Sequence, residues 1–227
     1  MAGTHRDNPW IADLEWVRPA PQDRGRRTQF RLLDALERLL DTEHIDDVSV
    51  AAIVSEASSS VGAFYHHFTD RQTLVYAMLE RVSNEFEATT RAAVAPERWQ
   101  HGGIEDILRG YLEFALDVGR TRPGLRRAEA VLALRDPEVR AMLDKQRRLL
   151  ADGVGDLLRA RVGEIGHPDP LLAIDYVVAQ TAAVLDARLD AHQPGALLAD
   201  HDDAVFIAET LRSIRAYLDL RPAPTPD

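Results

Sequence analysis

Apolar residues recur every three or four positions through most of the chain, and this spacing is the feature that most restricts its fold. In one stretch, Leu74, Met78 and Val82 fall four residues apart, which places them on one face of a helix. Almost nowhere do four to eight residues alternate between apolar and polar, as a half-buried strand would. The sequence therefore predicts an all-α fold.

Proline and glycine divide this pattern into segments of helical length. The long segment from Thr69 opens on Thr-Asp-Arg-Gln, which has the form of a capping box, and ends before Pro96. Residues 1–23 contain three prolines and predict an arm that is either disordered or laid on the body, and residues 221–227 are too rich in proline to fold. The remaining helices are predicted over residues 27–40, 49–55, 60–67, 103–119, 124–134, 137–162, 170–191 and 203–220.

Composition excludes several classes of protein. The 37 acidic residues outnumber the 27 basic ones, so a protein that coats nucleic acid or anionic membrane with its whole surface is not expected. A local basic patch remains, because residues 24–31 hold four arginines and no acid. The chain has no cysteine, which excludes disulfides and thiolate metal sites. The first thirty residues lack a signal sequence, and we expect a cytoplasmic protein without a membrane partner.

Enzyme motifs are few. Glu164 and His167 form the single Glu-x-x-His pair, whereas a di-iron bundle needs two such pairs and two more glutamates. The adjacent His66 and His67 would point about 100° apart on a helix, which does not suit a shared metal ion. We therefore predict no catalytic residue, metal or cofactor. A metal-dependent all-α enzyme is the alternative, and metal analysis of the purified protein tests it.

Residues 47–74 carry the most informative pattern. Ser49 is placed to cap one short helix, and Ser60 is placed to cap a second one. Phe64 and Phe68 lie four residues apart and would face inward from the second helix. Two short helices joined by a tight turn form a helix-turn-helix, a motif whose second helix enters the major groove of DNA.

Residues 27–81 resemble the DNA-binding domain of the TetR family of bacterial repressors. The resemblance implies a DNA-binding domain over residues 24–72 and a ligand-binding and dimerisation domain over residues 73–220. It further implies a repressor that a small-molecule effector releases from its operator. The residues that carry it, in the family's order and spacing, are Ile53, Ala57, Ser60, Gly62, Phe64, Tyr65, His67, Phe68, Arg71 and Leu74.

The chain departs from the family pattern at positions that affect the turn and the recognition of bases. Ser58 stands where the family usually has the turn glycine, which predicts a turn that is either strained or follows a slightly different path. Ala51, Val61 and Ala63 occupy positions from which family members often send polar side chains to DNA. Contact between Val61 or Ala63 and a thymine methyl group remains available. The alternative is a helical interaction protein of the same fold whose specific DNA recognition is weak or lost.

The candidate DNA-binding residues combine the motif with the arginine cluster. Tyr65 has an alternative role as a cover for the edge of the core. The arginine cluster has the alternative role of a solvated helix start. Cations oppose the helix dipole at that end, however, so an external anion explains the cluster better. The set is Arg24, Arg26, Arg27, Ser49, Ala51, Ser60, Val61, Gly62, Ala63, Tyr65, His66, His67 and Arg71.

The last two predicted helices have apolar faces that are too broad for one buried stripe. The family resemblance implies that they form a dimer interface, and a dimer suits a palindromic operator on double-stranded DNA. A larger monomeric core is the alternative. The candidate interface residues are Leu171, Ile174, Val178, Leu185, Ile207, Leu211, Ile214 and Leu218.

The resemblance also implies an effector pocket among the middle helices, with apolar walls and a few polar groups. Filling of the core is the alternative role of each of these side chains. The candidate lining residues are Phe86, Trp99, Tyr111, Phe114, Met142, Tyr176 and Gln180.

Overall fold

The computed structural model describes residues 24–189, 198 and 200–220, and describes side chains from Arg27 onward. The predicted arm (1–23) and tail (221–227) lie outside the described residues, as do the side chains of Arg24 and Arg26. The described part of the chain is built from α-helices and short 3-10 turns, which confirms the all-α fold.

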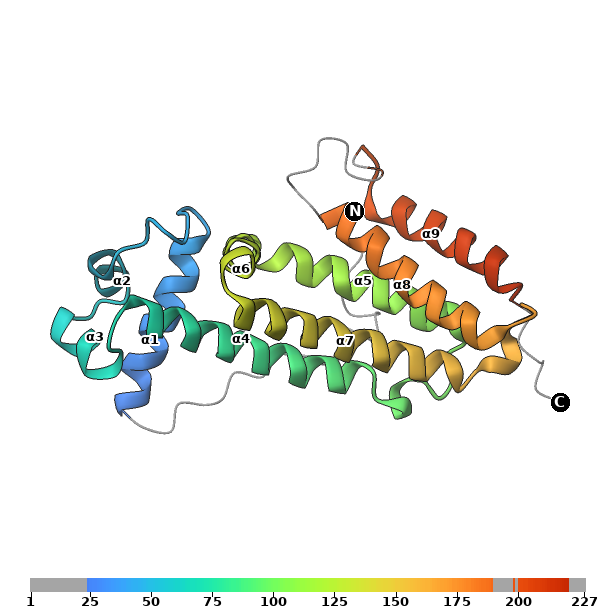
Figure 1. Ribbon diagram of the computed structural model, residues 1–227, viewed down its shortest axis with the longest axis horizontal. Coiled ribbons are helices and arrows are strands. Elements are labelled where there is room, and N and C mark those ends of the chain that lie inside the picture. The colour runs from blue at the N-terminus through green and yellow to red at the C-terminus, as the bar shows by residue number, and fades with distance from the viewer. Residues whose placement is uncertain (1–23, 190–197, 199, 221–227) are drawn as a thin grey trace. The chain divides into compact units, whose positions relative to one another are not determined.

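The helices follow the predicted segments closely (Figure 1). Predicted and observed helix ends differ by three residues or fewer, because prolines and capping residues mark the ends in the sequence. The α-helices are α1 (Arg24–Leu40), α2 (Val50–Glu56), α3 (Val61–His67), α4 (Arg71–Ala93), α5 (Ile104–Thr121), α6 (Pro123–Arg135), α7 (Pro137–Arg159), α8 (Pro170–Leu189) and α9 (Asp203–Leu218), with 3-10 turns η2 (Pro96–Trp99) and η3 (Val162–Glu164).

The structure divides into two compact units, which are described separately. The head unit contains α1 to α3, α4 as far as Ala88, and residues 121–146, which form α6 and the start of α7. The body unit contains residues 89–120 and the chain from Arg147 onward. Both α4 and α7 therefore contribute residues to the two units.

The core of the head unit is a continuous set of buried apolar side chains. Leu32 and Leu36 of α1 meet Ile53 of α2, Phe64 of α3 and Met78 of α4, all of them inaccessible to solvent. Leu125 and Ala128 of α6 are buried in the same cluster. This core fixes α3 relative to α1 and α4, and so determines which face of α3 remains exposed.

A buried arginine links α4 to α1 within the head unit. The Arg81 side chain is 8% exposed, and its two terminal nitrogens donate to Asp34 at 2.6 Å and Glu37 at 2.9 Å. A buried charge is tolerated where it is paired and hydrogen-bonded. Two carboxylates from successive turns of α1 meet this requirement, so they fix the register of α1 against α4.

The start of α6 lies directly against the end of α1. A Cβ atom on Gly124 would lie 2.2 Å from the carbonyl oxygen of Leu40, so this close approach requires glycine. The Arg127 guanidinium donates to the carbonyl oxygens of Leu40 and Asp41, each at 3.1 Å. These bonds satisfy carbonyls that the end of α1 leaves unpaired.

The body unit has its own core, in which Trp99 is fully buried and donates through Nε1 to the carbonyl of Ala93 at 2.8 Å. Helix α8 is long and apolar enough to cross a membrane by length and composition alone, with a mean hydropathy of 1.3 over its most apolar window. Its residues Ile174 and Val177 are fully buried in this unit. A single helix that packs in this way is a weak indication of a membrane span.

Candidate nucleic-acid interface

Helices α2 and α3 begin as the sequence predicts. The Ser49 hydroxyl accepts a hydrogen bond from the amide of Ala52 at 3.1 Å, and the Ser60 hydroxyl accepts one from the amide of Ala63 at the same distance. Each serine satisfies an amide that the first helical turn leaves free. Both predicted caps are therefore confirmed.

The turn between α2 and α3 places a serine in the left-handed region. Ser58 has a φ of 48°. Its amide donates to the carbonyl of Ser55 at 3.0 Å, and the amide of Ser59 donates to the carbonyl of Val54 at 2.8 Å. These two bonds form a Schellman motif, whose left-handed position is usually a glycine. Of the two predicted alternatives, the structure shows the strained one, with a serine in the left-handed conformation.

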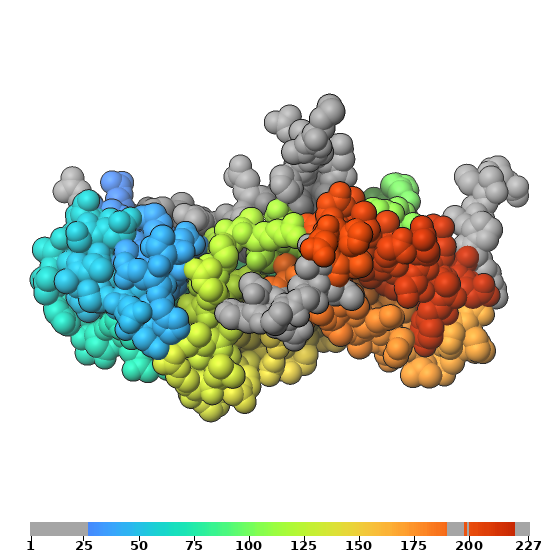
Figure 2. Space-filling view, turned by 90° about the horizontal axis from the view of Figure 1, so that it is seen from above, coloured from blue at the N-terminus to red at the C-terminus, as the bar shows by residue number. Residues whose placement is uncertain are grey.

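One face of α3 is anchored in the core. Phe64 and Phe68 are buried, and their ring centroids lie 5.8 Å apart. The opposite face carries Val61, which is 51% exposed, and Tyr65, which is 57% exposed. The surfaces of α2 and α3, light blue to cyan in Figure 2, lie together on the head unit. This arrangement leaves the outer face of α3 free to meet a partner.

The remaining predicted DNA contacts have different surroundings. Arg27, Ser49, Ala51, Gly62 and His66 are exposed, as is Ser60, whereas Ala63 and His67 are half-buried. The rings of His66 and His67 have centroids 5.0 Å apart and meet nearly at right angles. Among the described residues, no group of three or more His, Asp or Glu side chains is arranged to hold a metal ion.

Arg71 has a partner within the protein. Its guanidinium donates to the backbone carbonyl of Ile45, in the loop that joins α1 to α2. The side chain is half-buried, so it connects the start of α4 to this loop. A contact between Arg71 and DNA stays a prediction, and it would have to use the nitrogens that this bond leaves available.

The cap at the start of α4 differs from the predicted capping box. Asp70, and not Thr69, is the capping residue: its carboxylate accepts from the amide of Thr73 at 2.8 Å and from its hydroxyl at 3.0 Å. These bonds hold the pKa of Asp70 below its usual range. The Gln72 amide instead donates to the Tyr76 hydroxyl, so the capping-box prediction was wrong. Aspartate and threonine both cap helices well, and the sequence alone does not choose between neighbours.

The seven candidate effector residues are divided between the units. Phe86 and Met142 belong to the head unit, and Met142 packs against its core. Trp99, Tyr111 and Phe114 are buried in the body unit, where burial raises the pKa of Tyr111 to about 12. The other two candidates are less buried. Gln180 is half-buried, and Tyr176 is exposed with its ring 5.0 Å from that of Tyr217.

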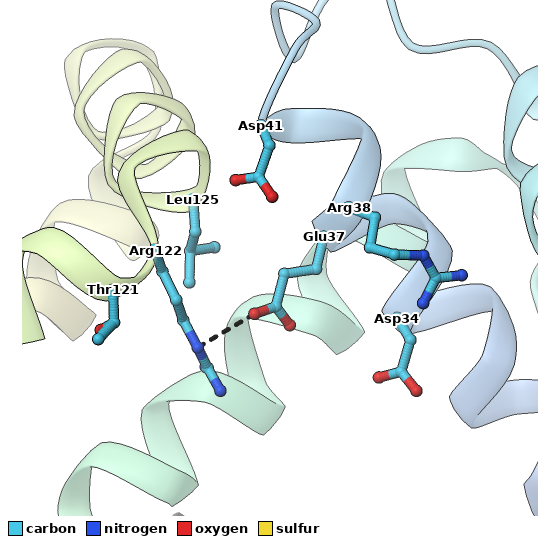
Figure 3. Close-up of a pocket in the computed structure, with 7 residues that line it drawn as sticks. All are labelled: Asp34, Glu37, Arg38, Asp41, Thr121, Arg122 and Leu125. Carbon is cyan, nitrogen blue, oxygen red and sulfur yellow. Dashed lines mark ion pairs between the residues drawn. The ribbon is translucent and has the colours of Figure 1, made fainter.

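The head unit contains a polar pocket of about 150 Å³ between α1 and the start of α6 (Figure 3). Arg122 reaches toward α1, where its Nε lies 3.1 Å from Glu37, and its terminal nitrogens donate to the buried Glu85 at 3.1 Å. None of the seven candidate effector residues lines this pocket. Its lining consists of Asp34, Glu37, Arg38, Asp41, Thr121, Arg122 and Leu125.

The candidate dimer residues mostly lie in the core of the subunit. Leu171 is exposed, but the other seven are buried within the body unit: Ile174, Val178, Leu185, Ile207, Leu211, Ile214 and Leu218. The broad apolar faces of α8 and α9 are thus covered largely by the chain itself. Sequence reasoning missed Leu172, which is exposed together with Leu171 and Tyr176 at the start of α8. It also missed Gly124 and Arg127, although a Pro-Gly pair marks the start of α6.

The helix-turn-helix segment and the overall fold each have counterparts among known proteins. Residues 32–78 match the model of the bacterial regulatory proteins of the tetR family. The match likens this segment to the DNA-binding region of the tetR family, whose members bind DNA and form dimers. A search of curated proteins finds no match to the sequence.

Solved structures show the same fold along most of the chain. SCO4454, a tetR-family transcriptional regulator from Streptomyces coelicolor, has 22% identity and a TM-score of 0.59, covering 91% of this chain and 98% of its own. NemR from Escherichia coli, in its reduced form, has 18% identity and a TM-score of 0.60, covering 87% and 100%. GusR from Salmonella enterica has 20% identity and a TM-score of 0.57, covering 87% and 98%. At these identities the likeness is one of fold.

Proposed function

We propose that the protein is a dimeric repressor that binds a palindromic operator on double-stranded DNA and is released from it by a small-molecule effector. The observation that carries the proposal is the exposed outer face of α3 in a helix-turn-helix whose residues 32–78 match the family model. Recognition helices in dimers of this kind enter successive major grooves about 34–36 Å apart. The region 24–72 is the proposed DNA-binding domain, and residues 73–220 bind effector and partner.

Phosphate contacts supply most of the binding energy in this proposal. Arg27 and Ser49 are exposed on the head unit, and Tyr65 and His66 are exposed on α3. The outer face of α3 offers few polar groups for hydrogen bonds to bases, because Val61 and Gly62 occupy its first turn. Affinity therefore falls steeply with salt, as counterions are released from the DNA on binding.

The dimer surface is proposed on α8 and α9, at the apolar side chains that the subunit leaves exposed. Leu171, Leu172 and Tyr176 lie within two turns of α8, and Val205 is exposed on α9. Apolar groups gathered in this way are typical of protein interfaces. The buried candidates support this surface from behind and do not contact the partner themselves.

Effector release is proposed to act through α4. This helix contributes Arg81 and Glu85 to the ion pairs of the head unit, and its last turns belong to the body unit. An effector in the body unit that binds one position of α4 more tightly shifts the head toward that state. The candidate lining residues in the body unit are the buried Trp99, Tyr111 and Phe114.

Selection of bound fragments from the organism's own DNA tests the proposal, followed by affinity measurements at several salt concentrations. We expect a palindromic site to be enriched. Tyr65→Ala should weaken binding by about 1–3 kcal/mol if Tyr65 makes a specific contact, with unchanged circular dichroism. Leu134→Ala is the matched control, because Leu134 is 80% exposed on α6, away from α3. Absence of any enriched site would favour the alternative of a helical interaction protein.

A further inference from the structure

The outer face of α3 presents an exposed apolar pair. Val61 and Tyr65 lie four residues apart and so project from the same side of the helix. They are the large apolar side chains that α1, α2 and α3 expose in the part of the chain with described side chains. Exposed apolar groups placed side by side on a recognition helix indicate a partner that offers apolar atoms in return.

The protein itself leaves the space around Val61 open. A Cβ atom on Gly62 would meet one side-chain atom within 4 Å, the hydroxyl oxygen of Ser60 at 3.9 Å. Gly62 has no left-handed φ, so neither its conformation nor internal packing requires a glycine. Because a glycine destabilises a helix relative to alanine, its presence here suits close approach of an outside surface to the backbone.

We propose that Val61 recognises the methyl group of thymine, so that the preferred operator carries thymine where each α3 meets the major groove. This inference rests on the proposed function, which places α3 in that groove. Against a phosphate or a polar base edge, a valine would displace bound water without replacing its hydrogen bonds, which is unfavourable. The thymine C5-methyl is the apolar group that the major groove projects toward a protein. Its contact with Val61 removes apolar surface of both partners from water.

The pairing also specifies the kind of sequence preference. A valine cannot accept or donate a hydrogen bond, so it distinguishes thymine from cytosine by the methyl group alone. Loss of one buried methyl corresponds to about a fourfold change in affinity. Because the free energies of two separated contacts add, the two symmetric half-sites together would change the affinity about 15-fold.

The test uses the full-length protein and a duplex selected from a randomised pool of double-stranded DNA. Thymines of the selected duplex are replaced one symmetric pair at a time by deoxyuridine, which lacks only the methyl group. We expect one pair of replacements to weaken binding about 15-fold. The Val61→Ala variant should discriminate between the thymine and deoxyuridine duplexes less strongly than the wild type, because alanine offers the methyl group less apolar surface, whereas the control variant Leu134→Ala should discriminate as the wild type does.

The outcomes separate the inference from the function on which it rests. Enrichment of a duplex whose affinity is indifferent to every deoxyuridine replacement would refute the role of Val61 and leave DNA recognition standing. Equal discrimination by the wild type and Val61→Ala would assign the methyl contact to another residue and also overturn the inference. If no duplex is enriched, the proposed function fails and the inference fails with it. Alanine favours a helix more than valine does, so Val61→Ala should remain folded, and circular dichroism checks this.

Discussion

Replacement of Gly124 by alanine tests the contact between α6 and α1. The new Cβ would lie 2.2 Å from the Leu40 carbonyl oxygen and 2.6 Å from the Asp41 amide nitrogen. Since an ordinary contact between carbon and oxygen begins at about 3.3 Å, α6 must move by about 1 Å. Both obstructing atoms belong to the backbone at the end of α1, so no side-chain rotation relieves the overlap.

The expected loss of stability follows from what this movement disturbs. Leu125 and Ala128 pack in the head core on the same helix, and Arg127 bonds to the two carbonyls that end α1. Overpacking of a fitted contact costs about 1–3 kcal/mol. The higher helix propensity of alanine offsets about 1 kcal/mol of this cost. With weakened Arg127 bonds included, we expect a net loss of about 2 kcal/mol in the free energy of unfolding.

Urea unfolding followed by circular dichroism measures this loss, and hydrogen exchange at the last amides of α1 locates it. Gly163→Ala is the matched control, because a Cβ there meets nothing within 4 Å. We expect that control to remain within about 0.5 kcal/mol of the wild type. A Gly124→Ala protein with the urea midpoint and exchange rates of the wild type would show that α6 does not press on α1.

Three further predictions concern the turn, an exposed ion pair and the dimer. Ser58→Gly should raise the melting temperature, with a gain of about 0.5–1 kcal/mol, because glycine adopts the left-handed φ without strain; a lower melting temperature would contradict this. The Arg135 guanidinium, which bonds to the Asp46 carboxylate, holds the pKa of Asp46 below its usual range. The ionised carboxylate therefore stabilises the fold at pH values above its unfolded pKa of about 3.9. This stabilisation is lost as the pH falls through the lower pKa of the folded state. Asp46→Asn should therefore flatten the pH dependence of unfolding below about pH 4, and an unchanged slope would show that the ion pair adds nothing. Leu172→Glu combined with Tyr176→Glu should give monomers in sedimentation, and a persistent dimer would place the interface elsewhere.

The fold could be predicted from the sequence because local signals agree with each other. Ser49, Ser60 and the prolines that open α6 and α7 mark helix starts, and the spacing of Phe64 and Phe68 identifies the buried face of α3. These features depend on neighbouring residues alone, so they can be recognised before the chain is folded.

Other features depend on contacts between distant segments, and the sequence did not reveal them. Nothing local indicates that Arg71 bonds to the carbonyl of Ile45, 26 residues earlier. The periodicity of α8 and α9 correctly identified apolar faces, but it could not show that the subunit itself covers Ile214 and Leu218. The exposure of Val61 and Tyr65 on α3 was easier to predict than the exposure of residues on α8 and α9. The buried face of α3 is marked by Phe64 and Phe68, only a few residues away in the sequence.

The buried arginine of α4 has a consequence for how this sequence can change over generations. Loss of one carboxylate at Asp34 or Glu37 leaves Arg81 underpaired in the core, and removal of one member of a buried pair is far more damaging than replacement of the whole set by apolar residues. A lineage would have to pass through an unstable intermediate to exchange these three residues for an apolar cluster. Substitutions at the three positions should therefore be correlated among related proteins, and each residue should be retained as long as the others are present.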